Sequence, residues 1–475
     1  MRLPAPIIFT LVLSACGSDD TAGQDGGEGT AAVTTSGSTS GPLSTVDATT
    51  ASRTETDEGS DPDTGSSTGT TKDDTGGELS CFSPVLGETL TLDPDGPDGQ
   101  IHPSVWFDAE SEGVWVVYNA PNNAGLFDVF VTRVGCDGIT QVAPTQVNHT
   151  PEHNDVDPDI VRDGDRMIVV WTSDDGSGGD SNLGIALQSI DLDGTPQLED
   201  DRVLETSLGA VPFVGNAWMP RLAAGELGGL AVIGTRANEA ANAFQVFVQR
   251  LGPDAVSEGP TAAFDGLTAS HTTPHAALNS AGDVLAAWVS TEDSVLHQIE
   301  VGRMSGDDEF DTRVPTVVVA DNSSAPAIVV SPPQVYMARA VGAGGSGQIQ
   351  VARGLGLDSP TTLVNDDGTP QHTPAMAPMP EGAALAWYRN MGGFANALLV
   401  ARVHDDEAAL VVDPPIVVPD AIAAPYATTV THVTDELVFV AWTQGTSPAF
   451  RIYGRFVDLG DKAPRRPALP PMSDL

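Results

Sequence analysis

The chain has little of several things that common protein classes require. Its 475 residues include 3 cysteines, 5% aromatic residues, and 21 Lys and Arg against 65 Asp and Glu. The cysteines are too few for a small disulfide-built domain or a four-thiolate metal site. The formal charge of −44 repels phosphate backbones and anionic lipid headgroups, which excludes nucleic acid as a partner. After residue 16 no apolar run approaches the ~18 residues that a membrane-spanning helix needs.

The N-terminus predicts export and anchoring. Residues 1-16 contain one basic residue, Arg2, followed by an apolar run from Ile7 to Leu13 of the length of a secretory signal. The run ends in Leu13-Ser14-Ala15-Cys16, which resembles the lipobox of bacterial lipoproteins. The resemblance implies cleavage before Cys16 and acylation of that cysteine, hence a lipid anchor in a membrane. An ordinary signal peptide is the alternative.

The lipobox resemblance also implies a location. Gly17 follows the cysteine where an aspartate would favour retention at the inner membrane. By the sorting rules of that family, we expect an outer-membrane lipoprotein of the cell envelope that faces the periplasm or the surface.

Residues 17-80 are predicted to form a disordered tether. Of these 64 residues 37 are Gly, Ser or Thr, none is aromatic, and 13 are acidic. Such a segment buries too little apolar surface to offset its chain entropy. Residues 461-475 form a second such segment, a Pro-rich C-terminal tail.

Residues 81-460 contain seven copies of one unit. In each copy a proline opens a short apolar stretch, and a strand-like run that ends in Arg or Gln closes 27 to 30 residues later. The prolines recur every 48 to 62 residues, at Pro103, Pro158, Pro220, Pro274, Pro326, Pro374 and Pro425. The closing residues are Arg133, Gln188, Arg250, Arg303, Arg353, Arg402 and Arg455. Because they recur in every copy, we interpret them as structural and expect them to form ion pairs between neighbouring copies.

The repeat predicts an all-β fold, a seven-bladed β-propeller of four-stranded blades. A period of about 50 residues with four short β-branched runs is typical of a propeller blade. Copy seven ends after three strands, and the lone strand Val85 to Leu92 precedes copy one. We expect that strand to complete the last blade and so remove the exposed edges. The aromatic residues of the second strands, such as Trp171 and Trp288, are expected in the blade core.

The units resemble propeller repeats of bacterial surface proteins. Pro158-Asp159-Ile160, Val169-Val170-Trp171 and Leu192-Asp193-Gly194 carry this resemblance. It implies the fold and little about activity, because these are packing motifs. The sialidase Asp box, the WD repeat pair and the kelch double glycine are absent from the sequence.

Cys81 and Cys136 are predicted to form a disulfide. In the expected ring they belong to adjacent blades, and an envelope location is oxidising. Two free thiols are the alternative.

Candidate site residues lie in the loops that enter the innermost strands and in the loops between second and third strands, which share one face around the central channel of a propeller. They are His102, His153, His271, His275, His372, Asp93, Asp95, Asp155, Asp157 and Asp175. Imidazoles and carboxylates can bind zinc, and carboxylates with carbonyls suit calcium. The competing interpretation is that these are turn residues that cap backbone groups.

Three functions remain open. The leading hypothesis is a surface-tethered, monomeric, non-catalytic module that binds a protein or a glycan. The second is an enzyme that acts on extracellular polysaccharide, for which Asp157 with Asp93 or Asp175 are the candidate carboxylates. The third is a calcium-dependent adhesive or structural protein.

Overall fold

The structure is a computed structural model. It describes residues 81, 84–150, 152–174, 183–204, 217–225, 228–238, 243–263, 270–292, 296–305, 310–319, 325–341, 347–355, 361–364, 369–392, 395–406, 409–421 and 426–460. The chain divides between Lys72 and Asp73, and the described residues all belong to the second unit, Asp73–Leu475. The predicted signal, tether and C-terminal tail lie outside the described residues.

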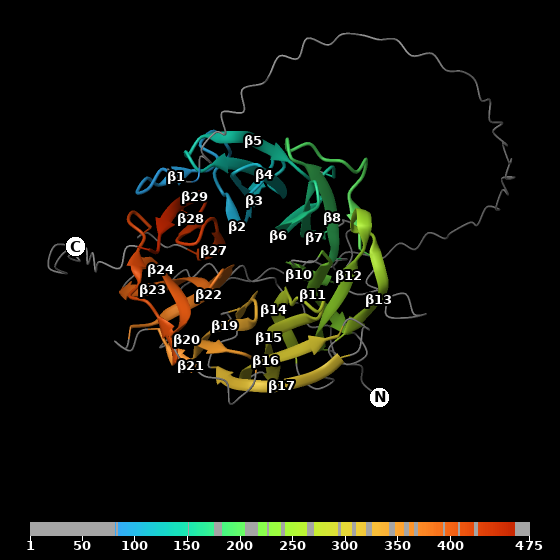
Figure 1. The fold of residues 1–475 in the computed structure, drawn as a ribbon. Helices are drawn as coiled ribbons and strands as arrows, with labels where there is room; N and C mark the ends of the chain where they lie inside the picture. Colours follow the sequence, from blue (N-terminus) through green and yellow to red (C-terminus); the bar gives the residue numbers. More distant parts are fainter. Residues whose placement is uncertain are drawn as a thin grey trace, which may run out of the picture. The chain divides into compact units, whose positions relative to one another are not determined.

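Seven antiparallel sheets form the second unit, which confirms the seven-bladed propeller (Figure 1). Blades one to three comprise β2 (Ile101–Asp108), β3 (Gly113–Pro121), β4 (Phe127–Gly135) and β5 (Thr140–Gln146); β6 (Asn154–Asp163), β7 (Arg166–Asp174), β8 (Leu183–Asp191) and β9 (Arg202–Val203); and β10 (Ala217–Ala224), β11 (Leu230–Asn238), β12 (Ala243–Leu251) and β13 (Ser257–Ala263). A short 3-10 turn, η2 (Pro253–Ala255), precedes β13.

The other four blades follow the same order, and blade six has a fifth strand that pairs with its third. They comprise β14 (Ser270–Leu278), β15 (Val284–Glu292), β16 (Leu296–Met304) and β17 (Phe310–Val319); β18 (Ala327–Ser331), β19 (Gln334–Val341), β20 (Gln348–Arg353) and β21 (Thr361–Leu363); β22 (Gln371–Met379), β23 (Gly382–Gly392), β24 (Ala395–Asp406), β25 (Ala409–Val412) and β26 (Ile416–Val417); and β27 (Tyr426–His432), β28 (Leu437–Thr446), β29 (Ala449–Asp458) and β1 (Leu90–Thr91). No helix within the described residues is long and apolar enough to cross a membrane.

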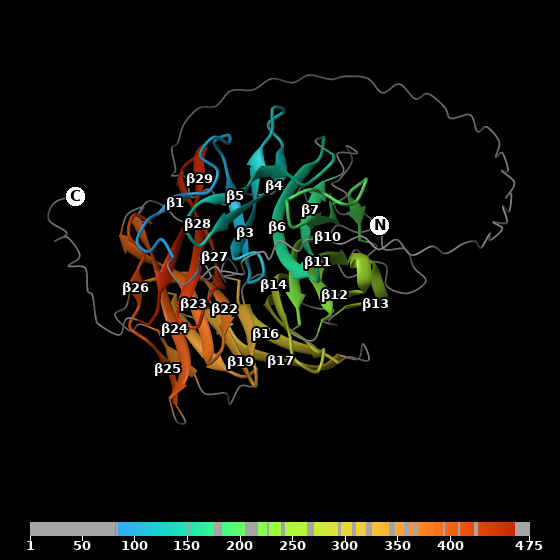
Figure 2. The same cartoon turned by 45° about the horizontal axis from the view of Figure 1, so that its top comes forward.

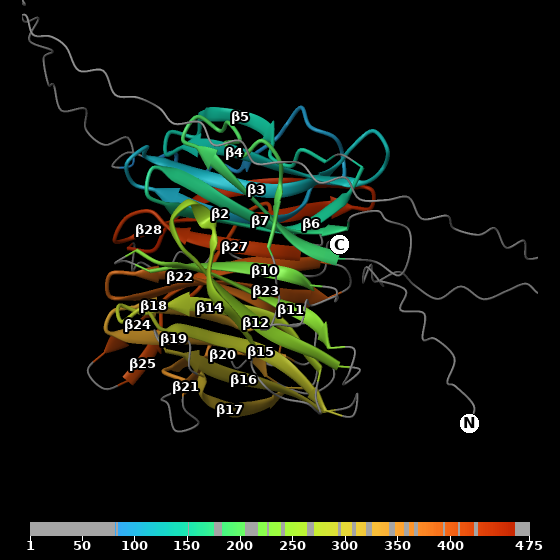
Figure 3. The same ribbon diagram turned by 90° about the vertical axis from the view of Figure 1, so that its right-hand side faces the viewer.

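The first strand of every blade is the innermost one. β2, β6, β10, β14, β18, β22 and β27 each contact the next, and β27 contacts β2, so they form a closed ring. The blades radiate from it toward outer strands such as β5, β13 and β17 (Figures 1 and 2). Figure 3 shows the same blades from the side. We call the end at which the innermost strands begin the leading face of the ring.

The core is divided into seven clusters, one in each gap between neighbouring blades. The second strands face apolar neighbours on both sides, which explains their continuous apolar runs. Their aromatic residues occupy one register position and are fully buried: Tyr118, Trp171, Trp288, Trp387 and Trp442. Blades three and five have Gly234 and Arg339 at this position. At Gly234 the ring of Phe247 fills the space that a side chain would occupy, because an added Cβ would lie 2.9 Å from that ring.

The ring closes as the sequence predicts. Leu90 and Thr91 pair with Gly454 and Tyr453 of β29, so a strand upstream of blade one completes blade seven. The predicted disulfide between Cys81 and Cys136 is also present, with a Cα–Cα distance of 4.9 Å. It joins the closing segment to the end of β4 in blade one.

The recurring prolines mark a bulge in the innermost strands. Six of these strands shift register near their start and hold a non-glycine residue at positive φ: His102, Asp157, Met219, Thr273, Thr373 and Ala427. In five of them the next residue is the proline. Proline has no N–H to donate to a ladder, so a bulge is a place where a sheet tolerates it.

The closing arginines reach the next blade by more than one kind of contact. Arg353 forms the expected ion pair between blades, with Asp405 of blade six at 2.9 Å. Arg133 and Arg250 cross to the next blade but donate to backbone carbonyls, those of Leu192 and Gly282. A carbonyl satisfies a guanidinium in any blade, whereas an ion pair needs an acidic residue at one fixed place.

We predict that removing the disulfide lowers stability without changing the fold. The bond closes a loop with a sequence separation of 55 residues, and its loss should cost up to about 4 kcal/mol on loop-entropy grounds. Thermal melting of Cys81→Ser/Cys136→Ser should therefore show a lower Tm than the oxidised parent. Reductant should lower the Tm of the parent to that of the variant and leave the variant unchanged. Equal melting of the oxidised parent and the variant would contradict a stabilising role.

Candidate functional site

Two of the predicted site residues meet across neighbouring blades. His102 and Asp157 occupy the positive-φ bulge positions of β2 and β6. Nδ1 of His102 lies 2.9 Å from Oδ1 of Asp157, and the two side chains are 33% and 24% exposed. A carboxylate at Nδ1 favours the tautomer with its proton on that nitrogen, which leaves Nε2 as a free base.

Arg221 adds a positive charge to this pair. Burial raises the pKa of Asp157, but the charge of His102, its hydrogen bonding and the charge of Arg221 outweigh burial and hold this pKa below its usual range. Asp157 is therefore ionised at neutral pH. Arg221 follows Pro220 at the bulge of blade three, and its side chain is half-buried.

The residue after each bulge proline forms a second set of contacts around the ring. Ser104 Oγ donates to Asp159 Oδ1 at 2.5 Å, and Leu222 N donates to Asp159 Oδ2 at 2.7 Å, so Asp159 links blades one, two and three. Ile328 N donates to His275 Nδ1 at 3.4 Å, which links blades five and four. Burial and the nearby charge of Arg221 lower the pKa of His275 to about 4, so this histidine is neutral and carries its proton on Nε2.

These residues are unequally distributed around the ring. We call His102, Ser104, Asp157, Asp159, Arg221 and His275, all in blades one to four, the inner-ring cluster. At the positions that match Ser104 and Asp159, blades five to seven have Ala327, Ala375 and Thr429. Packing in a repeat protein favours similar residues in every copy, so the charged and polar residues confined to blades one to four are not required by the repeat itself.

A second group of predicted residues lies at the start of blade two. Asp155 is buried, and Asn148 Nδ2 donates to its Oδ2 at 2.7 Å. Burial raises the pKa of Asp155 to about 7, opposed by hydrogen bonding from Ser173 and helped by the charge of Asp201. His153 Nδ1 lies 3.3 Å from Ser173 Oγ.

The other predicted residues lie apart from these groups. Asp93 is buried and accepts hydrogen bonds from the Tyr118 hydroxyl (2.7 Å) and Gln100 Nε2 (3.1 Å). Both donors are side chains, so these contacts are not the backbone capping of the competing interpretation. Asp95 is exposed, and His372 is half-buried in β22. His271 belongs to β14, but its side chain lies outside the described residues, as does Asp175.

The metal prediction remains a prediction. Within the part of the chain that the structure describes, no three His, Cys, Asp or Glu side chains converge as a metal site would require.

Sequence reasoning missed Ser104, Asp159 and Arg221. They all directly follow a repeat proline, and this fixed offset from the bulge was the available signal.

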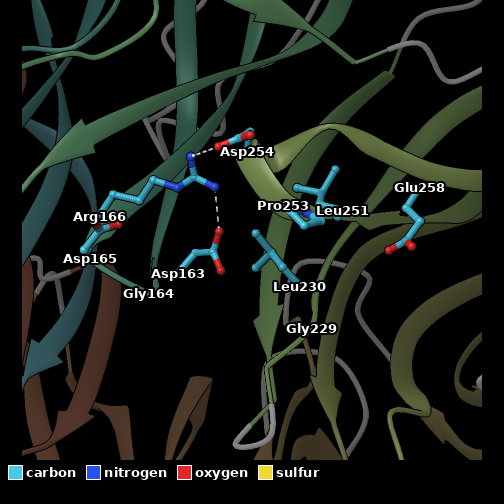
Figure 4. Close-up of a pocket in the computed structure, with 11 residues that line it drawn as sticks. Asp163, Gly164, Asp165, Arg166, Gly229, Leu230, Leu251, Pro253, Asp254 and Glu258 are labelled. Atoms are coloured by element: carbon cyan, nitrogen blue, oxygen red, sulfur yellow. Dashed lines mark hydrogen bonds and ion pairs between the residues drawn. The ribbon is translucent and has the colours of Figure 1, made fainter. Parts of the chain in front are cut away.

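A pocket of about 450 Å³ lies on the opposite side of the ring from the leading face, between blades two and three (Figure 4). It is formed by the turn after β6, the start of β11 and the turn after β12. Arg166 spans it, with Nη2 2.9 Å from Asp163 and Nη1 2.9 Å from Asp254. Among the described residues that line the pocket, Arg166 has the only cationic side chain, and it is already paired with two carboxylates.

The sequence matches no family model and no curated protein. Solved structures share the fold. A polysaccharide lyase, an ulvan lyase bound to GlcA(1-4)Rha3S, superposes with a TM-score of 0.51 at 10% identity, over 79% of this chain and 99% of that one. A protein of unknown function from Dyadobacter fermentans gives 0.48 at 11% identity (79% and 98%), and an α-L-arabinanase of Penicillium chrysogenum with arabinobiose gives 0.47 at 12% (80% and 99%). At these identities the likeness shows the propeller fold alone.

We predict that Asp155 makes stability depend on pH. Its pKa rises from 3.8 unfolded to about 7 folded, so between about pH 4 and pH 7 the native state binds the extra proton. The free energy of unfolding should fall over this range as the pH rises, by at most about 4 kcal/mol.

Chemical denaturation of Asp155→Asn should show a weaker fall and a gain over the parent of about 3 kcal/mol at about pH 8. Asp165→Asn, at an exposed turn, is the matched control and should follow the parent. Parallel pH curves for Asp155→Asn and the parent would contradict the assignment.

Proposed function

We propose that this protein acts on an acidic polysaccharide and cleaves it by β-elimination at the inner-ring cluster. The observation that carries the proposal is the His102–Asp157 pair beside Arg221. It combines an oriented base with a cation that can face a sugar carboxylate, the two elements that removal of a proton next to a carboxylate requires.

The residues have distinct roles in the proposed reaction. Nε2 of His102 takes the C5 proton of a uronate residue while Asp157 stabilises the imidazolium that forms. Arg221 and the Nε2–H of His275 face the uronate carboxylate and the charge that develops on it. The C4–O bond then breaks as the C4–C5 double bond forms, and the proton passes to the leaving oxygen. The products are an unsaturated uronate end and a new hydroxyl end.

Elimination suits this cluster better than glycoside hydrolysis. A hydrolase needs one carboxylic acid that stays protonated and a second carboxylate across the bond. The lowered pKa of Asp157 makes it a poor acid. Both oxygens of Asp159 already accept hydrogen bonds, from Ser104 and from the Leu222 amide.

One further arginine lies near the leading face. Arg389 is half-buried and pairs with Gln371, the first residue of β22. Arg236 and Arg339 are 0% and 5% exposed and donate to Gln245 and Gln350, so they lie within their blades. The ulvan lyase described above has the same fold, which is consistent with the proposal.

We also propose that the propeller works at the cell envelope. The support is the lipobox-like Leu13-Ser14-Ala15-Cys16, the composition of residues 17-80, and the Cys81–Cys136 disulfide, a bond typical of oxidising compartments. Acyl chains at Cys16 and a long tether would place the propeller within reach of extracellular polysaccharide.

We predict that His102→Gln and Asp157→Asn abolish most of the activity. The parent should release unsaturated uronate, followed by ultraviolet absorbance, from one of alginate, polygalacturonate, hyaluronan or ulvan. Loss of the base should lower kcat by about 10²- to 10⁴-fold. The matched control is His404→Gln, which removes the histidine of another His–Asp contact, 3.9 Å from Asp413, and should leave kcat unchanged.

Two results would contradict the proposal. Cleavage with parental kcat by His102→Gln would exclude His102 as the base. Binding of these polysaccharides without any product would instead favour the non-catalytic glycan-binding module.

A further inference from the structure

Trp218 differs from the tryptophans of the blade cores. Five of the seven tryptophans are fully buried: Trp115, Trp171, Trp288, Trp387 and Trp442. Trp218 is half-buried and directly precedes the bulge residue Met219 in β10. It therefore lies at the leading end of an innermost strand, at the position next to the one that holds His102 in blade one and Asp157 in blade two.

The register places Trp218 and Arg221 on one face of blade three. Trp218 pairs with Thr235 and Arg221 pairs with Ile233, and these partners are two residues apart on β11. Because side chains two apart on a strand share a face, Trp218 and Arg221 point to the same side of the sheet. Ile233 belongs to the apolar cluster between blades three and four, so this side faces blade four.

Phe244 fixes the indole there. Its ring lies 4.9 Å from that of Trp218 at an interplanar angle of 84°, an edge-to-face contact. Phe244 pairs with Ala237, two residues beyond Thr235, so it shares the face. Both rings are half-buried. Among the described residues, neither ring is part of the apolar cluster between blades three and four. The aromatic pair thus extends beyond the blade core on the side that holds Arg221.

We propose that Trp218, supported by Phe244, is a sugar-stacking subsite for a pyranose ring of the acidic polysaccharide whose carboxylate faces Arg221. This inference rests on the proposed function for the identity of the ligand. A pyranose presents weakly positive C–H groups on its faces, which complement the negative face of an indole. An aromatic surface beside a cation matches a uronate, which has an apolar ring face and a carboxylate at its edge.

The inference predicts a fluorescence signal on binding. The probes are uronate oligosaccharides prepared from alginate, polygalacturonate and ulvan, titrated into full-length protein that carries His102→Ala so that nothing is cleaved. With five tryptophans buried, a saturable change in emission should come from Trp218. It should disappear with Trp218→Phe and persist with Trp106→Phe, the control at the other half-buried tryptophan, which pairs with Trp115 near the far end of β2.

Affinity gives a second measurement. Calorimetric titration of Trp218→Ala should show binding weakened by about tenfold, which corresponds to about 1.4 kcal/mol. The inference fails if Trp218→Ala binds as tightly as the His102→Ala parent, if none of the probes binds, or if the signal follows Trp106.

The failures of the two proposals are distinguishable. In the His102-containing protein, product formation with an unchanged KM for Trp218→Ala would overturn the subsite and leave the elimination reaction standing. Binding that depends on Trp218 without any product would overturn the elimination reaction and leave the subsite standing.

Discussion

Every blade must bury both of its faces, and the rest of the structure depends on this constraint. The seven apolar clusters each lie between two blades. A row of such sheets would leave one apolar face uncovered at each end, and closure into a ring removes both ends. Closure in turn gathers seven innermost strands around one axis, where residues from four different blades meet. The inner-ring cluster is thus a product of the packing.

The bulge connects this packing to the chemistry. A non-glycine residue at positive φ is strained by about 1–2 kcal/mol, and six innermost strands hold one. The surrounding ladder maintains the strain because each of these strands is paired on one side and packed on the other. The bulge turns His102 of blade one toward Asp157 of blade two, which regular strands would not do. The bulge recurs for structural reasons. At each bulge position, however, the side chain can differ from one blade to the next.

Much of the fold could be predicted from the sequence because seven copies of the same unit show the same pattern. The period of the prolines, the apolar second strands and the lone strand before copy one determine blade number and closure. The Cys81–Cys136 bond followed from that ring. The site was less predictable, because which side chains meet depends on register and bulge geometry. His102 and Asp157 were found as residue types that suit a site, but their contact required the bulge. Arg221 was missed because its offset from the repeat proline can be seen in the sequence, but its closeness to Asp157 depends on how the blades pack.

The closing strand has a consequence for the order in which the molecule forms. β1 comes first in the described part of the chain, and its partner β29 comes last. During synthesis from the N-terminus, β1 has no native partner until the other blades have emerged. Blades one to six can pair locally beforehand, but the last sheet joins segments more than 350 residues apart, the kind of contact that slows folding. A chain cut short anywhere before β29 would have an open ring with two apolar blade faces in water. The architecture therefore makes the arrival of the last strand the step that distinguishes a finished molecule from an aggregation-prone one.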